Sequence, residues 1–353
     1  MHRSVVVLLI LNVVVSTFVV LSSHHWFTVW FGLEMNTLSI LPMLAYQYTP
    51  RSVESTVKYF LVQSFSAAII LNVALIQAWF YTSWSIYSPL NVFTSSILTL
   101  ALALKLGLFP CHYWFPDVIQ GLGFLQGLVL STWQKVAPFI LISYVISSLN
   151  GFVFVVISVL SVVVGAWGGL NQTQFRKILA FSSISHIGWI GSVMFYSVNV
   201  SMVMFVVYVV LNSSVFLLGH ELNLNSLFSL GRLVYLNSTS GFCLILGILS
   251  LGGLPPLMGF LTKFLALECL INNEVFLLSG FLVMGSLISL FFYLRIAFNS
   301  ILILFPQHSM VVFVWRSVNF YKVGLSVTSV VLGILLSISV FGLVCFPLLI
   351  SFS

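Results

Sequence analysis

The chain is divided into long apolar stretches separated by short polar gaps, and this pattern restricts it to a membrane fold. A helix rises about 1.5 Å per residue and the hydrocarbon core of a bilayer is about 30 Å thick, so about 20 apolar residues cross it. We identify eleven such stretches, at residues 4–22, 26–46, 59–80, 92–114, 121–147, 151–170, 178–196, 198–219, 239–267, 275–294 and 324–350. The pattern therefore predicts about eleven transmembrane helices.

The composition supports the same conclusion and leaves little room for a separate soluble domain. Of the 353 residues, 60% are hydrophobic and 5% are charged, and the mean hydropathy is +1.18. A soluble fold of this length needs more polar surface than that. Strands of a membrane barrel alternate apolar and polar residues, whereas residues 202–211 are apolar without alternation. We predict an all-α, polytopic membrane protein with a single transmembrane domain over residues 1–353.

The basic residues outside the apolar stretches occupy alternate gaps. If the first helix starts on side A, the gaps on that side hold nine of them and the gaps on the other side hold none; the nine are Arg3, Arg51, Lys58, Arg176, Lys177, Arg232, Arg295, Arg316 and Lys322. Basic residues collect on the cytoplasmic or matrix side of a membrane. We therefore expect the amino terminus on the inside and the carboxyl terminus on the outside, where Glu268 and Glu274 also fall.

Several other classes of function have no support. The net charge of +6 is spread along the chain, and only Arg176 and Lys177 are adjacent, which argues against nucleic-acid binding. The glycines of residues 121–127 do not have the spacing or the preceding strand of a dinucleotide-binding loop. The cysteines lack disulfide or metal-ligand spacing, so we expect neither a metal site nor a cofactor; they are Cys111, Cys243, Cys269 and Cys345.

Two stretches contain helix-breaking clusters close to a lysine. One cluster covers residues 105–110 and has Pro116 just beyond it, and the other covers residues 252–256. Proline removes a backbone donor and clashes with the preceding turn, so such breaks persist in a bilayer only where protein or water satisfies the freed carbonyls. We expect two broken helices that border a polar cavity.

The order of the helices predicts an inverted repeat. If the first five helices (about 1–148) and the next five (about 151–298) form two units, the broken helix is the fourth in each. Because five is odd, the second unit is inverted, and paired interrupted segments are typical of a transporter's central site. The helix at about 324–350 is then an addition. This prediction depends on helix order and not on sequence identity between the halves.

Four ionisable side chains fall inside apolar stretches, and they are Glu34, Lys105, Lys135 and Lys263. A charge at membrane depth costs roughly 2.5–3.5 kcal/mol on insertion scales, so each is a candidate functional residue. We expect Glu34 to pair with Lys105, and the four to form a path for ions or protons. The alternatives are a structural ion pair at Glu34 and lysines that extend to the membrane surface.

Two histidines, His112 and His186, also fall inside the stretches. A neutral imidazole donates one hydrogen bond and accepts another, which a proton relay requires. The alternative is a hydrogen-bonded structural histidine at each position. Both remain relay candidates at this point.

Five motifs follow one another along the chain, at residues 105–118 (KLGLFPCHYWFPDV), 132–138 (TWQKVAP), 168–177 (GGLNQTQFRK), 185–189 (SHIGW) and 252–260 (GGLPPLMGF). Together they resemble the subunit 2 family of mitochondrial NADH dehydrogenase, in the membrane part of respiratory complex I. The resemblance implies an antiporter-like subunit that moves protons while other subunits pass electrons from NADH, through FMN and iron–sulfur clusters, to ubiquinone. It implies no redox centre in this chain. Cys111 and Thr262 depart from residues common in the family.

The resemblance also implies roles, location and partners. Glu34 and Lys105 would form the charge pair of one half, Lys135 the central relay and Lys263 the far lysine. The chain would lie in the mitochondrial inner membrane with its amino terminus in the matrix and its carboxyl terminus in the intermembrane space. Its partners would be other complex I membrane subunits, especially the subunit 4 and subunit 4L neighbours, and lipids that include cardiolipin. A separate cation/proton antiporter and a purely assembly role remain as alternatives.

Overall fold

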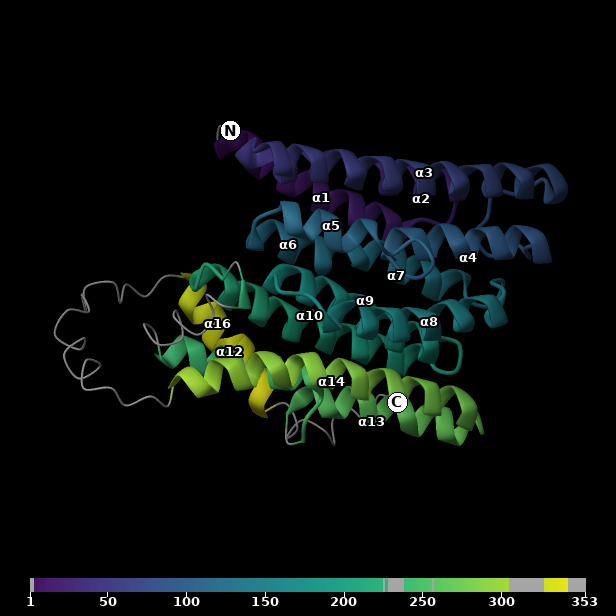
Figure 1. Ribbon diagram of the computed structural model, residues 1–353. Coiled ribbons are helices and arrows are strands. Elements are labelled where there is room, and N and C mark those ends of the chain that lie inside the picture. Colours follow the sequence, from purple (N-terminus) through teal and green to yellow (C-terminus); the bar gives the residue numbers. More distant parts are fainter. Residues whose placement is uncertain (1–2, 225, 228–237, 256, 305–326, 342–353) are drawn as a thin grey trace, which may run out of the picture.

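The computed structural model describes residues 3–224, 226–227, 238–255, 257–304 and 327–341, and every regular element in them is helical (Figure 1). The prediction of an all-α fold is confirmed. The helices are α1 (Arg3–Ser22), α2 (Trp26–Leu44), η1 (Ala45–Gln47), α3 (Pro50–Tyr81), α4 (Val92–Leu106), α5 (Trp114–Gly121), α6 (Phe124–Ser131), α7 (Trp133–Val145), α8 (Gly151–Leu170), α9 (Phe175–Met194), α10 (Val198–Glu221), α12 (Ser238–Gly252), α13 (Met258–Asn272), α14 (Phe276–Leu304) and α16 (Val327–Phe341).

The helices lie side by side in one bundle, with α1 to α7 along one side and α8 to α16 along the other (Figure 1). The largest group of buried apolar residues joins the two sides, and it includes Leu98 on α4, Ile142 on α7, Ile187 on α9 and Leu265 on α13. Helix α9 is buried around almost its whole circumference, as expected for an apolar helix in the middle of a bundle. The two sides meet where α5 and α6 pack against α9 and α10.

Six helical segments are long and apolar enough to cross a membrane by length and composition. They are Arg3–Ser22, Pro50–Tyr81, Phe124–Val145, Gly151–Leu170, Val198–Glu221 and Phe276–Ser300, and Val92–Leu106 and Ser240–Gly252 are shorter apolar helices. The structure thus supports a polytopic membrane protein. The total of about eleven spans stays a prediction.

Both predicted breaks interrupt their stretches. Helix α4 ends at Leu106 and α12 ends at Gly252, and each is followed by a glycine in the left-handed region, Gly107 and Gly253, with φ of 75° at both. Glycine adopts that conformation without the steric cost of a Cβ atom, which explains a helix end at these positions.

A third break was not predicted, because the stretch 121–147 was expected to form one helix. The structure divides it into α6 and α7 at Thr132. The Lys135 N–H donates to the Thr132 carbonyl (3.2 Å) and not to the carbonyl four residues back, so the helical ladder is interrupted there. The residue at the break is a threonine and not a glycine or proline, so the usual sequence signal for a break was missing.

Helix α3 extends beyond the apolar stretch 59–80 and begins at Pro50. Thr49 accepts a hydrogen bond from the Ser52 N–H (3.2 Å) and Pro50 occupies the first turn, a common combination at helix starts. Arg51 and Lys58, which were assigned to a gap, therefore lie in the first turns of this helix.

Most of the predicted side-A residues that the structure describes lie near the beginnings of helices. Arg3 begins α1, Arg51 and Lys58 lie in the first turns of α3, and Arg176 and Lys177 lie in the first turn of α9. Lys177 pairs with Asp117 (3.7 Å), and Arg176 donates to the Leu122 carbonyl. Arg295 donates to the carbonyl of Leu170 (2.6 Å), the last residue of α8, and to that of Gln172 (2.9 Å), just after it. Of the nine predicted side-A residues, Arg232, Arg316 and Lys322 lie outside the described residues.

Candidate functional site

Lys135 is the most enclosed charged residue of the site, with 2% of its surface exposed. Its Nζ atom lies 3.3 Å from the Ser183 hydroxyl on α9 and 3.4 Å from the Tyr208 hydroxyl on α10. It also lies 4.3 Å from the centre of the Phe115 ring. Hydroxyl dipoles and the faces of aromatic rings both stabilise a cation.

No carboxylate compensates this charge within the described part of the chain. The two ion pairs found there join Lys58 with Glu54 (2.6 Å) and Lys177 with Asp117 (3.7 Å), near the surface. Burial penalises a charge, and neutral dipoles offset part of that penalty without fixing the charge permanently as a carboxylate would. The surroundings of Lys135 are therefore suited to both its charged and its neutral form.

Tyr208 connects Lys135 to the break between α6 and α7. Its hydroxyl donates to the carbonyl of Ser131 (2.7 Å), the last residue of α6, and accepts from the Asn212 amide (3.3 Å). The Ser131 carbonyl has lost its helical donor because of the break, and a side chain from another helix replaces it. The break and the lysine site are thus one hydrogen-bonded unit.

Lys263 and His186 meet at the carboxyl end of α12. Lys263 Nζ donates to the Gly252 carbonyl (2.7 Å), and His186 Nε2 lies 3.2 Å from the Leu251 carbonyl. The second ring nitrogen of His186 lies 2.6 Å from the Ser182 carbonyl, one turn back on α9. The last carbonyls of a helix lack N–H partners and carry partial negative charge, which attracts cations. Lys263 therefore binds the helix break rather than extending to the surface.

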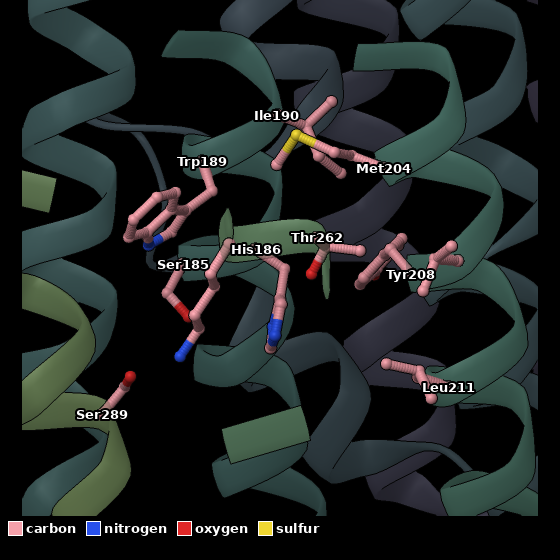
Figure 2. A pocket seen from close by; sticks show the side chains of 11 residues that line it. Ser185, His186, Trp189, Ile190, Met204, Tyr208, Leu211, Thr262 and Ser289 are labelled. Atoms are coloured by element: carbon pink, nitrogen blue, oxygen red, sulfur yellow. The ribbon is translucent and has the colours of Figure 1, made fainter. Parts of the chain in front are cut away.

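A small cavity joins these two groups of residues (Figure 2). It has a volume of about 20 Å³, and its lining includes His186, Tyr208, Thr262 and Lys263. A cavity of that volume is large enough for one water molecule. The rings of His186 and Tyr208 lie 5.9 Å apart between their centres. Tyr208, which contacts Lys135, thus lines the same cavity as His186 and Lys263.

Glu34 and Lys105 lie on the other side of Lys135, on α2 and α4. Lys105 is buried, with 5% exposed, and Glu34 is close enough to act on it electrostatically. They do not form the expected direct ion pair, because no described carboxylate lies within 4.0 Å of the Lys105 ammonium. The Glu34 carboxylate instead accepts a hydrogen bond from Thr37, one turn along α2 (3.2 Å).

Neutral polar residues that the sequence analysis missed fill the space between these charges. Tyr59 on α3 donates to Gln134 (3.2 Å), and Gln134 donates to Asn36 on α2 (2.9 Å). Gln63, one turn beyond Tyr59, donates to the Lys105 carbonyl (3.4 Å). The spacing of Tyr59 and Gln63 on one face of a helix was a signal for this network, because buried polar groups need partners.

His112 lies apart from these residues in the loop after α4. Its Nδ1 atom is 3.2 Å from the Pro110 carbonyl, and its ring packs against Tyr113, with ring centres 4.0 Å apart. These contacts stay within its own loop, which favours the structural alternative, and a relay role for His112 stays a prediction. Cys111, Cys243 and Cys269 are free thiols, and Cys345 lies outside the described residues.

Two protein-family models together match almost the whole chain. The model described as "NADH:quinone oxidoreductase/Mrp antiporter, TM" matches residues 23–289. The model described as "NADH dehydrogenase subunit 2 C-terminus" matches residues 290–350. The first match contains all four of the charged residues that the sequence singled out.

Curated relatives and solved structures agree with these models. NADH-ubiquinone oxidoreductase chain 2 of Patiria pectinifera is 64% identical over 351 residues, which cover 99% of both chains. That of Pisaster ochraceus is 62% identical over 352 residues, which cover 100% of both. A chain of respiratory complex I from Thermus thermophilus has the same fold, with a TM-score of 0.82 and 23% identity over 98% of this chain and 80% of that one. A chain of the Mrp complex from Dietzia also shares the fold, with a TM-score of 0.75 and 17% identity over 82% of this chain and 59% of that one. The chain therefore belongs to the NADH-ubiquinone oxidoreductase chain 2 family, whose members are subunits of that enzyme and have an antiporter-like membrane fold.

Proposed function

We propose that the chain is a proton-translocating membrane subunit of NADH:ubiquinone oxidoreductase (complex I). It moves protons through Glu34, Lys105, Lys135 and Lys263, with His186 between the last two. The observation that carries this proposal is Lys135, a buried lysine held by neutral groups and joined through Tyr208 to the cavity at Lys263. A structural lysine at that depth would be expected to have a fixed counter-ion.

Coupling along the row is electrostatic. A change in a neighbouring subunit alters the interaction of Glu34 with Lys105, and the altered charge at Lys105 biases the protonation of Lys135 and then of Lys263. Charges roughly 10 Å apart at an effective dielectric constant of about 20 interact with about 1.7 kcal/mol. Moving one charge across 100 mV requires about 2.3 kcal/mol, so interactions of this size are sufficient in scale.

The proposed architecture is about eleven membrane helices, of which ten form two inverted five-helix repeats over about 1–148 and 151–298, with an added helix at about 324–350. In the described part of the chain, the two glycines in the left-handed region are Gly107 and Gly253, one at the end of each broken helix, and this supports it. At each, the glycine N–H bonds to the carbonyl three residues back and the next N–H to the carbonyl five residues back. The distances are 3.2 and 2.9 Å at Gly107 and Leu108, and 3.0 and 3.4 Å at Gly253 and Leu254.

The proposed location is the mitochondrial inner membrane, with the amino terminus and the basic end of the bundle in the matrix and the carboxyl terminus in the intermembrane space. The basic residues at the starts of α3 and α9, and Arg295 beside the end of α8, support that orientation. The proposed partners are other complex I membrane subunits, particularly subunits 4 and 4L, and lipids that include cardiolipin. FMN, iron–sulfur clusters and ubiquinone belong to the electron path of those other subunits.

Proton uptake by proteoliposomes that contain the assembled complex tests this function. We expect NADH and ubiquinone to drive proton movement, with no requirement for a second cation. A cation/proton antiporter would instead exchange cations for protons in the absence of NADH. That result would replace the proposed function. Variants of the row that assemble fully and fail to move protons would exclude a purely assembly role.

Glu34→Gln is expected to lower the rate of proton translocation about tenfold, because a factor of ten corresponds to about 1.4 kcal/mol, similar to one charge interaction over such a distance. The change keeps the size of the side chain and its contact with Thr37. The measurement is the initial rate of NADH-driven proton uptake. Glu54→Gln, at an exposed carboxylate of α3, is the matched control and should leave the rate unchanged. Equal rates in both variants would remove Glu34 from the row.

A further inference from the structure

The Tyr208 hydroxyl has only one proton to donate, and its polar neighbours are Ser131, Lys135, Asn212 and the Ser183 hydroxyl. In this structure it donates to the Ser131 carbonyl (2.7 Å) and accepts from Lys135 (3.4 Å) and Asn212 (3.3 Å). A tyrosine hydroxyl offers one donor and two acceptor positions, so all of them are in use. This arrangement requires Lys135 to be the donor, and so it fits the charged form of the lysine or an amine with its hydrogens toward Tyr208.

Loss of a proton from Lys135 changes what Tyr208 can do. The neutral amine has a lone pair, and the strongest donor within reach is the Tyr208 hydroxyl. If the hydroxyl turns to the amine, it must leave the Ser131 carbonyl. No other donor to that carbonyl is found in the described part of the chain, because the Lys135 N–H bonds to Thr132. The end of α6 then loses its hydrogen bond to α10.

We propose that Tyr208 is a positioning residue that couples the protonation of Lys135 to the break between α6 and α7. When Lys135 is charged, Tyr208 ties the break to α10; when Lys135 is neutral, Tyr208 binds the amine and the break is released. This inference rests on the proposed function of Lys135 and adds a means by which proton loss changes helix position. A pump needs such a change, because a proton must leave by a different side from the one it came from.

Ser183 provides a matched comparison within the same site. It also accepts from Lys135 (3.3 Å), and its hydroxyl donates to the Ala180 carbonyl (2.7 Å). That carbonyl lies inside the continuous helix α9, so turning the Ser183 hydroxyl does not free a break. The other titratable groups around Tyr208 are His186 on α9, Lys263 on α13 and Tyr293 on α14, and none of these is a carboxylate.

The test compares Tyr208→Phe with Ser183→Ala in the assembled complex, using protons translocated per NADH oxidised over a range of pH. Each variant removes one acceptor of Lys135, and only the first removes the contact with Ser131. We expect translocation to fall about tenfold in Tyr208→Phe, as for loss of a hydrogen bond to a charged group, and less than about twofold in Ser183→Ala. The loss in Tyr208→Phe should persist at every pH, whereas a change of pH should restore Ser183→Ala.

Equal losses in the two variants would overturn the inference, because both would then act only by surrounding the ammonium. Should Tyr208→Phe fail to assemble, Tyr208→Gln replaces it. A glutamine amide has a separate donor and acceptor, so it can tie Ser131 and Lys135 but cannot exchange between them; normal translocation in it would contradict the proposal. Lys135→Met is measured in parallel. Normal translocation in Lys135→Met would contradict the proposed function itself. If Lys135→Met abolishes translocation and the Tyr208 and Ser183 variants show equal losses, only the inference about Tyr208 is contradicted.

Discussion

Lys135→Met is expected to abolish NADH-driven proton translocation while the complex still assembles. General acid–base groups typically contribute roughly 10²- to 10⁴-fold to proton transfer, so the rate should fall by at least about a hundredfold. Methionine is unbranched and adaptable, and fills the space of the lysine stem among Phe115, Ser183 and Tyr208. Initial rates of proton uptake in proteoliposomes, with NADH oxidation recorded in the same sample, measure the effect.

The local structure should tolerate this change. Ser183 keeps its hydrogen bond to Ala180 (2.7 Å), and Tyr208 keeps its bond to Ser131 (2.7 Å), so neither hydroxyl loses its acceptor. Replacing a buried charge with an apolar side chain of similar volume is often neutral or stabilising. Assembly that is reduced as strongly as translocation would therefore indicate that Lys135 locks helices together, in favour of the assembly alternative.

Lys58→Met is the matched control for the loss of a lysine. Lys58 lies on α3 with 45% of its side chain exposed, and it pairs with Glu54 one turn earlier (2.6 Å). Exposed pairs of this kind contribute about 0.2–1 kcal/mol, so translocation and assembly should both stay near the wild-type level. Equal losses at Lys58 and Lys135 would point to a general effect of net charge and would contradict a specific role for the buried lysine.

The sequence predicted the helical class, the two glycine breaks and the charged residues, because each depends on local composition. Apolar length specifies a membrane helix, and Gly107 and Gly253 specify helix ends by their conformational freedom. Charged residues within apolar stretches are likewise recognised from local composition. These features are visible without knowledge of which helices are neighbours.

The partners of those charged residues depend on tertiary packing and were not predicted. Tyr208 and Ser183 contact Lys135 from helices 73 and 48 positions away in sequence. The break at Thr132 has no glycine or proline, and its freed carbonyl is satisfied by Tyr208 from α10. A direct pair of Glu34 with Lys105 was expected from charge alone, but the position of the carboxylate also depends on Thr37. Neutral polar residues provide most of the contacts, and single-sequence patterns give them little weight.

Gly259→Ala is expected to prevent normal assembly, and it tests the close approach of α12 and α13 at the second break. A Cβ atom on Gly259 would lie 1.7 Å from the Ser250 carbonyl oxygen and 2.8 Å from the carbonyl carbon. Both atoms belong to the backbone of α12, so no side chain can turn aside. Overpacking typically costs about 1–3 kcal/mol and occasionally more, and a contact this short places the variant at the upper end. The amount of assembled complex and its thermal midpoint are the measurements.

The same clash should also disturb the lysine site, because Lys263 lies one turn beyond Gly259 on α13. Any shift of α13 away from α12 lengthens the bond of Lys263 Nζ to the Gly252 carbonyl, which is 2.7 Å in this structure. The complex that does assemble should therefore move fewer protons per NADH.

Gly280→Ala on α14 is the control, since a Cβ atom there meets nothing within 4 Å. Alanine also favours the helical state by about 0.5–1 kcal/mol over glycine, so that variant should be at least as stable as the wild type. Normal assembly of Gly259→Ala would show that α12 and α13 do not approach each other as closely as the site requires.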